Sequence, residues 1–501
     1  MLVNGYLKLG FYGLLVFCVG PHPLWAKDWL FSPTVNTGMI YTDNVNLKKD
    51  KQSAFVLETS PGIAVSRNTE NVRLGLNYKL QNLFNASSSQ NNLYHIFNFN
   101  SSLQVVNNSL FLDTRASNTQ QNSSSSVTSN SNISGINRTN VTSYGFSPSW
   151  TPHFNGYAVG NIRFNYDEIK TDNSAISDTT QTGQSVNITS DKRFSNKLSW
   201  RITHANSEQQ RNNSSSVKLQ NSEAETRLKI SKNVSFISLL GYSDNQYQTT
   251  SSSFKNGVYY TLGALWKPSR QFSIEAGYGN NSYVTLAVSP FRRLNWETTF
   301  RHKEIGTNLG DIWQSNFSYQ AKRTNVTVGY LEDTVTSQST LLSQAATTLG
   351  QTASATQYAP PINNAVASLS NSVYIRKRAN ATIAFNTGKS IFSANVYDER
   401  RLFQDTGRKE DLTGITASWT WQFAHSMNVY VSPLLQHTTR YNTVDIRKDI
   451  AIGVSKVIPV KFSRAGGMNA VLEYRHSNQK SDLVENTFDE NRLTANLLIA
   501  F

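Results

Sequence analysis

The sequence predicts an all-β protein, a transmembrane antiparallel β-barrel of roughly 22–26 strands, with about 24 as the best estimate. Apolar side chains recur at every second position in about two dozen segments of roughly ten residues, the length that a tilted strand needs to cross a bilayer. Short connections between these segments alternate with long polar ones. An apolar leader opens the chain, and no later segment is long and apolar enough for a transmembrane helix.

The alternation is clearest in three segments. In VRLGLNYKL, residues 72–80, and in DLTGITASWTWQF, residues 411–423, apolar side chains occupy one face and polar ones or glycine the other. The closing FDENRLTANLLIAF places on one face Leu493, Ala495, Leu497, Ile499 and Phe501. One such strand would fit a soluble sandwich equally well, so the repetition along the chain carries the prediction. The low apolar content, 38%, suits a wall whose other face meets water.

The connections favour a membrane barrel over a soluble β array. Short ones stand at 67–71, 231–233, 267–271, 387–389 and 424–426. Long polar ones stand near 43–53, 85–93, 120–140, 168–182, 206–216, 244–255, 333–371 and 398–410. A strict short-long alternation is typical of periplasmic turns and extracellular loops. The segments 120–140 and 333–371 are of low complexity and are predicted to be long surface loops.

The first 26 residues read as a cleaved signal peptide. Lys8 is the single charge before residue 27, an apolar run covers 9–20, and Leu-Trp-Ala ending at Ala26 suits a signal peptidase. The mature chain, 27–501, is then one barrel domain exported through the Sec route to a Gram-negative outer membrane. Cys18 would leave with the signal, which excludes disulfides, iron-sulfur ligation and covalent haem attachment.

Aromatic residues are placed as two interfacial belts would require. Beside short turns stand Trp29, Phe31, Trp150, Phe154, Trp266, Phe272, Trp421 and Phe423. Bordering long loops stand Tyr41, Phe84 and Tyr94. In a soluble core, aromatic residues would favour the middles of strands instead.

Charged residues opposite the apolar stripes are predicted to face the lumen. They are Arg73, Lys79, Asp113, Arg115, Arg163, Arg201, Glu225, Arg227, Glu275, Glu297, Arg301, Glu473, Arg475 and Arg492. Two interpretations remain open. The residues can form mutually neutralising ladders that stiffen the wall, or they can line a pore that conducts and selects solutes.

Nothing in the sequence indicates an enzyme. The histidines are scattered singly, and no nucleophile, base or metal-ligand pattern accompanies them, so we predict no catalytic residues, cofactor or metal. The loop with Asp43, Asn44, Asn46 and Asp50 offers oxygen ligands for calcium, but Lys48 and Lys49 within it argue against that. The net charge of +14 comes from dispersed residues, and in an exported chain it favours anionic lipid or an anionic polymer over nucleic acid.

Several stretches resemble a known family. They are YTDNVNL (41–47), FVLETSPGIAVS (55–66), LFLDTRASNTQQN (110–122), YGFSPSW (144–150) and the closing strand. They look like the outer-membrane β-barrel family associated with PEP-CTERM/exosortase systems, which is similar in turn to outer-membrane proteins of exopolysaccharide operons. The resemblance implies a Gram-negative outer membrane and a link to surface polysaccharide, and it implies no catalytic residues. Its implied partners are lipopolysaccharide, the barrel insertion machinery and exopolysaccharide export components.

Three functions are compatible with these features. The first is an outer-membrane pore or conduit linked to exopolysaccharide export. The second is a non-conducting adhesion or anchor barrel that acts through its loops. The third is a sheath around an electron-transfer partner, which a wide barrel could enclose.

The last strand carries a specific prediction. It should pair with the first strand, near 29–42, so that no strand edge is left in lipid. Phe501, Ile499 and Leu497 then resemble the terminal signal that insertion machinery reads in outer-membrane proteins. We expect deletion of Phe501 to lower the amount of assembled barrel, measured by surface labelling and by heat-modifiable migration on gels. Normal surface levels of the truncated protein would contradict this.

Overall fold

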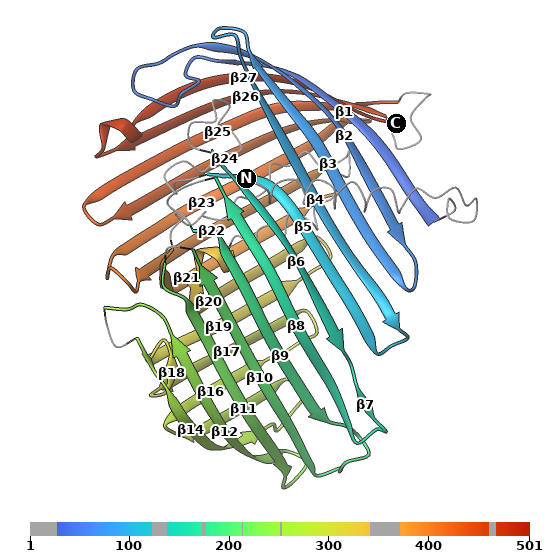
Figure 1. The fold of residues 1–501 in the computed structure, drawn as a ribbon, viewed down its shortest axis with the longest axis vertical. Coiled ribbons are helices and arrows are strands. Elements are labelled where there is room, and N and C mark those ends of the chain that lie inside the picture. Colours follow the sequence, from blue (N-terminus) through green and yellow to red (C-terminus); the bar gives the residue numbers. More distant parts are fainter. Residues whose placement is uncertain are drawn as a thin grey trace, which may run out of the picture.

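The structure is a computed structural model, and it describes residues 28–122, 138–172, 177–212, 214–250, 253–340, 371–459 and 467–501. Within them, 24 long strands form one closed antiparallel β-barrel (Figure 1). The strands are β1 (Trp29–Thr42), β2 (Ala54–Asn68), β3 (Val72–Asn85), β4 (Gln90–Val106), β5 (Leu110–Asn122), β6 (Arg138–Trp150), β8 (Ala158–Thr171), β9 (Thr179–Ser190), β10 (Leu198–Arg211), β11 (Val217–Lys229), β12 (Val234–Gln246), β14 (Gly257–Trp266), β15 (Phe272–Gly279), β16 (Asn281–Val288), β17 (Leu294–Lys303), β19 (Gly310–Gln320), β20 (Thr324–Thr336), β21 (Val373–Asn386), β22 (Ser390–Phe403), β23 (Lys409–Ala424), β24 (Met427–Arg440), β25 (Thr443–Ile458), β26 (Met468–Ser481) and β27 (Phe488–Ala500). Two-residue strands, β7 (His153–Phe154), β13 (Phe254–Lys255) and β18 (Gly306–Thr307), and the short helix η2 (Val484–Asn486) lie in the connections.

Each long strand pairs with its neighbours in the chain, and β1 closes the ring by pairing with β27. The register runs from Thr34 opposite Ala500 to Thr42 opposite Arg492, so the predicted closing pair and the strand number are confirmed. The backbone N–H of Phe501 also donates to the Pro33 carbonyl at 2.9 Å. The closed ring leaves no free edge, as lipid requires.

The outer face is apolar because every second side chain points away from the barrel. On β14, Val258, Tyr260, Leu262 and Trp266 are all at least half exposed, whereas Tyr259 and Thr261 between them are buried. The same alternation runs through β25, where isoleucines at 446, 450 and 452 alternate with buried polar residues. An apolar outer face with a polar inner face is the arrangement of a membrane-spanning barrel.

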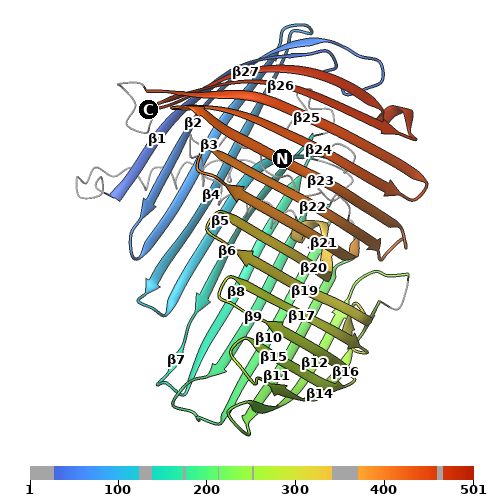
Figure 2. The same ribbon diagram turned by 180° about the vertical axis from the view of Figure 1, so that it is seen from behind.

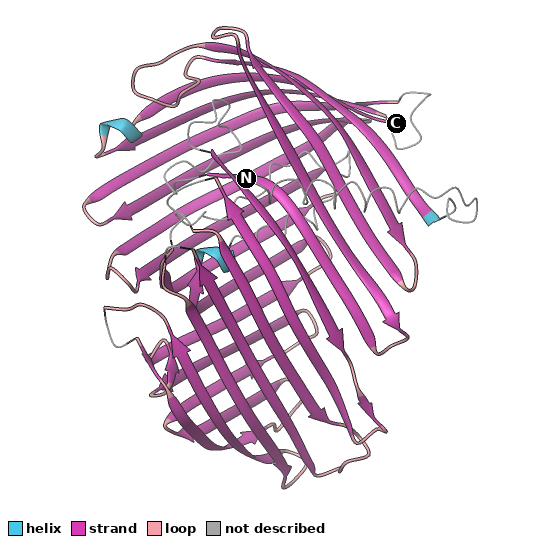
Figure 3. Ribbon diagram, viewed as in Figure 1, coloured by secondary structure: helices cyan, strands magenta, loops and turns pink. Residues whose placement is uncertain are grey.

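The barrel has one long axis, which is vertical in Figures 1 and 2. Figures 1 and 2 show β1–β5 and β23–β27 around one end of the long axis and β10–β17 around the other. The figures also show that the strands dominate the molecule, with helix confined to short turns (Figure 3). Among the described residues, no helix combines the length and apolar character that a membrane span would need.

The predicted connections need correction in detail. Strict short-long alternation is wrong, because Gly279 and Asn281 join β15 to β16 almost directly, and Arg440 and Thr443 bound an equally tight turn between β24 and β25. Many strands are longer than expected, up to 17 residues in β4, since pairing continues past the apolar band. The predicted 120–140 loop begins and ends in strand, and the predicted 333–371 loop begins in strand over residues 333–336. The centres of both loops lie outside the described residues, as does the predicted signal peptide, 1–26.

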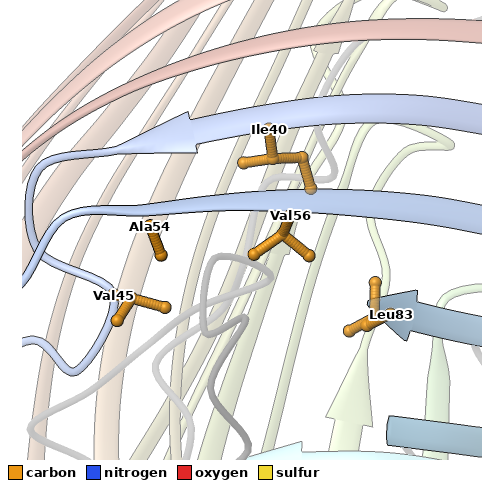
Figure 4. Close-up of a cluster of buried hydrophobic side chains, with 5 residues drawn as sticks. All are labelled: Ile40, Val45, Ala54, Val56 and Leu83. Atoms are coloured by element: carbon orange, nitrogen blue, oxygen red, sulfur yellow. The ribbon is translucent and has the colours of Figure 1, made fainter. Parts of the chain in front are cut away.

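The loop after β1 folds against the seam where the barrel closes. Val45 packs with Ile40, Ala54, Val56 and Leu83 in a buried cluster (Figure 4). Tyr94 packs against this cluster, so its place in an outer aromatic belt is wrong, whereas Tyr41 and Phe84 are exposed as expected.

Polar contacts secure the same seam. Asp43 accepts hydrogen bonds from the backbone N–H of Asn491 at 2.7 Å and from Lys51 at 2.9 Å. Partial burial alone would raise the pKa of the Asp43 carboxyl, but these bonds outweigh it and lower that pKa. The carboxylate therefore holds β27 to the loop.

Candidate functional site

The candidate site is the inner wall of the barrel. All the residues predicted for the lumen lie on the face opposite the exposed apolar side chains, and the structure joins most of them in ion pairs. Arg163 lies 2.6 Å from Asp113, and Arg115 pairs with Asp167 on β8. These two pairs link β5 to β8 across the inner face of β6.

A second group crosses β10, β11 and β15. Arg201 lies 2.6 Å from Glu225, Glu225 also pairs with Arg227, and Arg227 reaches Glu275 at 2.9 Å. The hydroxyl of Tyr283 donates to Glu275 at 2.7 Å. Positive and negative charges neutralise one another along this row, which is the arrangement expected of a stiffening ladder.

The remaining predicted residues are less connected. Arg475 pairs with Glu473 at 3.1 Å, Arg301 stacks over Tyr283, and Arg492 is buried. Three further predicted residues lie outside both groups and form no ion pair within the described part of the chain. They are Arg73, Lys79 and Glu297.

Sequence reasoning missed the most deeply buried network, which we call the arginine ladder. It runs from β21 to β25 through Arg378, Glu399, Arg401, Glu410, Arg440 and Asp445, with consecutive ion-pair distances of 3.5, 2.5, 3.6, 3.4 and 2.9 Å. The side chains of Arg401, Glu399 and Glu410 are at most 2% exposed. Buried charges of this kind are stable only when paired.

A signal for the arginine ladder was present in the sequence. In YDERRLF, residues 397–403, Tyr397, Glu399 and Arg401 stand at alternate positions, and Asp445 and Arg447 alternate with Ile446 in DIRKDI. Placing those residues in the inward phase would have found them. The alternation does not give the register between neighbouring strands, and that register decides which charged residues pair.

Tyrosines brace the inner wall over glycines. Tyr430 lies flat over Gly453, its direct partner on β25, where an added Cβ would come within 2.3 Å of the ring. The Tyr430 hydroxyl donates to Glu473 at 2.7 Å. Tyr259 repeats the arrangement over Gly241 and donates to Glu223 at 2.7 Å. Each unit ties neighbouring strands together through packing and one charge-assisted hydrogen bond.

At the end opposite the chain terminus, the two long walls contact each other across the lumen. Asn371, just before β21, exchanges hydrogen bonds with Ser177, just before β9, at 2.9 Å in both directions. Arg211 at the end of β10 donates to the Asn371 carbonyl, and Gln209 donates to Thr336 at 3.0 Å. The bonded residues lie 194, 160 and 127 positions apart in the chain. We call these contacts the waist.

Apolar contacts and a second crossing extend the waist. Val217, Tyr247 and Val373 form a buried cluster that joins β11, the end of β12 and β21. Beside it, the backbone N–H of Thr250 donates to the carbonyl of Gln404 at 2.8 Å. Because β9–β12 and β20–β22 are not neighbours in the sheet, the waist joins two parts of the wall that strand pairing does not join.

The polar groups of the inner wall are held mainly in ion pairs and hydrogen bonds. Among the described residues, no group of three or more His, Cys, Asp or Glu side chains could hold a metal ion. His476 contacts Asn491 at 2.9 Å and His204 contacts the Ser222 hydroxyl at 2.8 Å, both in the phase of the exposed apolar side chains of their strands rather than on the inner wall. The inner face can hydrate, guide or exclude a solute.

Comparison with known proteins gives similarity in structure alone. No family model matches the chain, and no curated protein matches it. The FrpB iron transporter from Neisseria meningitidis is 10% identical with a TM-score of 0.48, over 95% of this chain and 81% of that one. The siderophore receptor PirA from Acinetobacter baumannii is 9% identical with a TM-score of 0.46, over 94% and 80%. These similarities carry no argument about cargo, and the fold rests on the strand pairings described above.

Proposed function

We propose that the protein is an outer-membrane conduit linked to exopolysaccharide export or surface-polymer assembly. The observation that carries the proposal is the closed ring of 24 strands, apolar outside and polar inside. A barrel of this strand number is wide enough to enclose an aqueous path. The cargo rests on the resemblance of the first strands and the last strand to the exosortase-associated family.

The inner wall supports transport of a bulky, well-hydrated solute. Its charges are held in pairs, as Arg163 and Arg227 are, so a passing chain meets a rigid wall without a strong binding well. A conduit must bind its cargo loosely enough to release it. Partners expected on this basis are lipopolysaccharide around the barrel, the insertion machinery during assembly and polymer-export components.

Conductance tests the conduit directly. Purified protein in planar lipid bilayers should give stable ion conductance steps, because water and ions would fill a polar lumen. A matched extract from cells lacking the protein is the control. A silent bilayer would contradict the conduit and favour a non-conducting anchor, whereas co-purification of a haem protein would favour the sheath. Loss of secreted polymer in a deletion strain, with polymer retained in the periplasm, would support the cargo.

A further inference from the structure

Unpaired positive charge gathers on one half of one rim of the barrel. The consecutive short connections from β9 to β22, on the end that carries Phe501, hold a set of exposed bases that we call the basic arc. Its members are Lys192, Arg193, Lys197, Lys229, Lys232, Lys267, Arg270, Arg292, Arg293, Lys322, Arg323 and Lys389. Asp191 is the acidic residue in the same connections. The expectation of dispersed charge is therefore wrong for this rim.

The connections that carry the basic arc hold few carboxylates, with Asp191 as their acidic residue. Lys51, Lys170 and Lys218, near the opposite rim, each pair with a carboxylate at 2.7–2.9 Å. Within the described residues, no basic-arc side chain takes part in an ion pair; Arg193 donates to the Asn155 carbonyl at 3.0 Å. On the opposite rim, exposed bases such as Lys48, Lys49 and Arg408 share their connections with Asp43, Asp50 and Asp405, so the basic arc has the larger local excess of positive charge.

The one-sided placement argues against lipid as the occupant. Every strand of the barrel faces lipid, so a surface built for anionic head groups should surround the whole rim. On the rest of this rim, the connections 106–110, 150–157 and 424–426 contain no Lys, Arg, Asp or Glu, 69–71 contains Glu70, and 459–467 contains Lys461 and Arg464. A partner that approaches half of the mouth fits this distribution better than a continuous leaflet does.

We propose that the basic arc binds a linear polyanion, an acidic polysaccharide that carries carboxylates, at the mouth of the barrel. This deepens the proposed function, on which it rests for the polymer cargo. Short turns are the periplasmic side of outer-membrane barrels, so the arc faces the compartment from which an exported polymer arrives. Exposed bases spaced along consecutive turns suit an extended chain with repeated charges. Each contact is weak by itself, and many together give affinity through multivalency.

A binding experiment tests this with defined probes. Protein in nanodiscs of zwitterionic phosphatidylcholine is titrated with polygalacturonate, which is anionic, and with dextran, which is neutral. The arc variant neutralises six bases: K267Q, R270Q, R292Q, R293Q, K322Q and R323Q. We expect the variant to bind polygalacturonate more weakly by on the order of tenfold, and wild-type binding to weaken steeply with salt, because opposed charges are screened.

A matched variant removes the same charge from the opposite rim. It carries K48Q, K49Q, K255Q, R408Q, K409Q and K480Q, all at exposed positions. It should bind polygalacturonate as the wild type does. Equal loss in both variants, or equal binding of dextran, would overturn the proposal. So would an arc variant that keeps polyanion binding and loses only its preference for bilayers containing phosphatidylglycerol.

Conductance separates this inference from the conduit itself. The arc variant should fold and conduct like the wild type, since its changes lie on exposed turns. If the barrel conducts ions but does not bind polygalacturonate, the proposed conduit stands and the proposed role of the basic arc is overturned. A barrel that binds polygalacturonate through the arc and never conducts supports the arc and contradicts the conduit.

Discussion

Replacement of Arg401 by Met should lower the free energy of unfolding by about 3–5 kcal/mol, the cost of removing one partner from a buried ion-pair network. Arg401 lies between Glu399 and Glu410 in the arginine ladder, at 2.5 and 3.6 Å, and its side chain is 1% exposed. Without it, Glu399 keeps Arg378 at 3.5 Å and Glu410 keeps Arg440 at 3.4 Å, but the two buried carboxylates lose the cation between them and repel each other. Urea unfolding of the protein in lipid vesicles measures the change.

The preceding residue supplies the control. Arg400 points to the outer face, is 69% exposed and lies 3.6 Å from Asp398. R400M should change the free energy of unfolding by less than about 1 kcal/mol, as exposed ion pairs do. Combining R401M with E399Q and E410Q should restore part of the stability, because the repulsion between the two buried carboxylates is then removed. Equal effects of R401M and R400M would contradict the role given to the arginine ladder.

The fold could be predicted because strand alternation is local. A segment such as 72–80 shows its two faces within nine letters, and the terminal apolar face ending at Phe501 needs a partner in lipid wherever the other strands lie. Turn positions were harder. Between β15 and β16 the alternation continues with the same spacing past Gly279, so the tight turn leaves little trace in the pattern.

The sequence predicted which charged side chains point inward, but it did not predict which of them form ion pairs. Arg201 and Glu225 stood in the inward phase, but their ion pair depends on the register between β10 and β11. The waist is a stronger case, since Ser177 and Asn371 are 194 residues apart and meet only because the barrel is flattened there. No local pattern encodes that distance. The basic arc, likewise, appears only once consecutive short turns are known to share one rim.

Breaking the waist should enlarge the conducting path. Val373 is buried against Val217 and Tyr247, and Asn371 carries the bonds to Ser177. The double variant N371A/V373D removes those bonds and places a charge in the apolar contact, which favours separation of the walls and entry of water. Single-channel conductance should then rise roughly twofold, because the aqueous lumen is wider once the two walls no longer meet.

A control variant with a charge in the lumen, away from the waist, shows whether conductance rises because the walls separate or because a negative charge was added. Leu331 on β20 is 41% exposed and lies on the inner face, in the same phase as Asp333. L331D adds the same negative charge without touching the waist, and should leave single-channel conductance close to that of the wild type. A similar rise in both variants would assign the effect to charge alone. No rise in the double variant would mean that the ions already pass where the walls do not meet, and that the waist serves to hold the flattened barrel in shape.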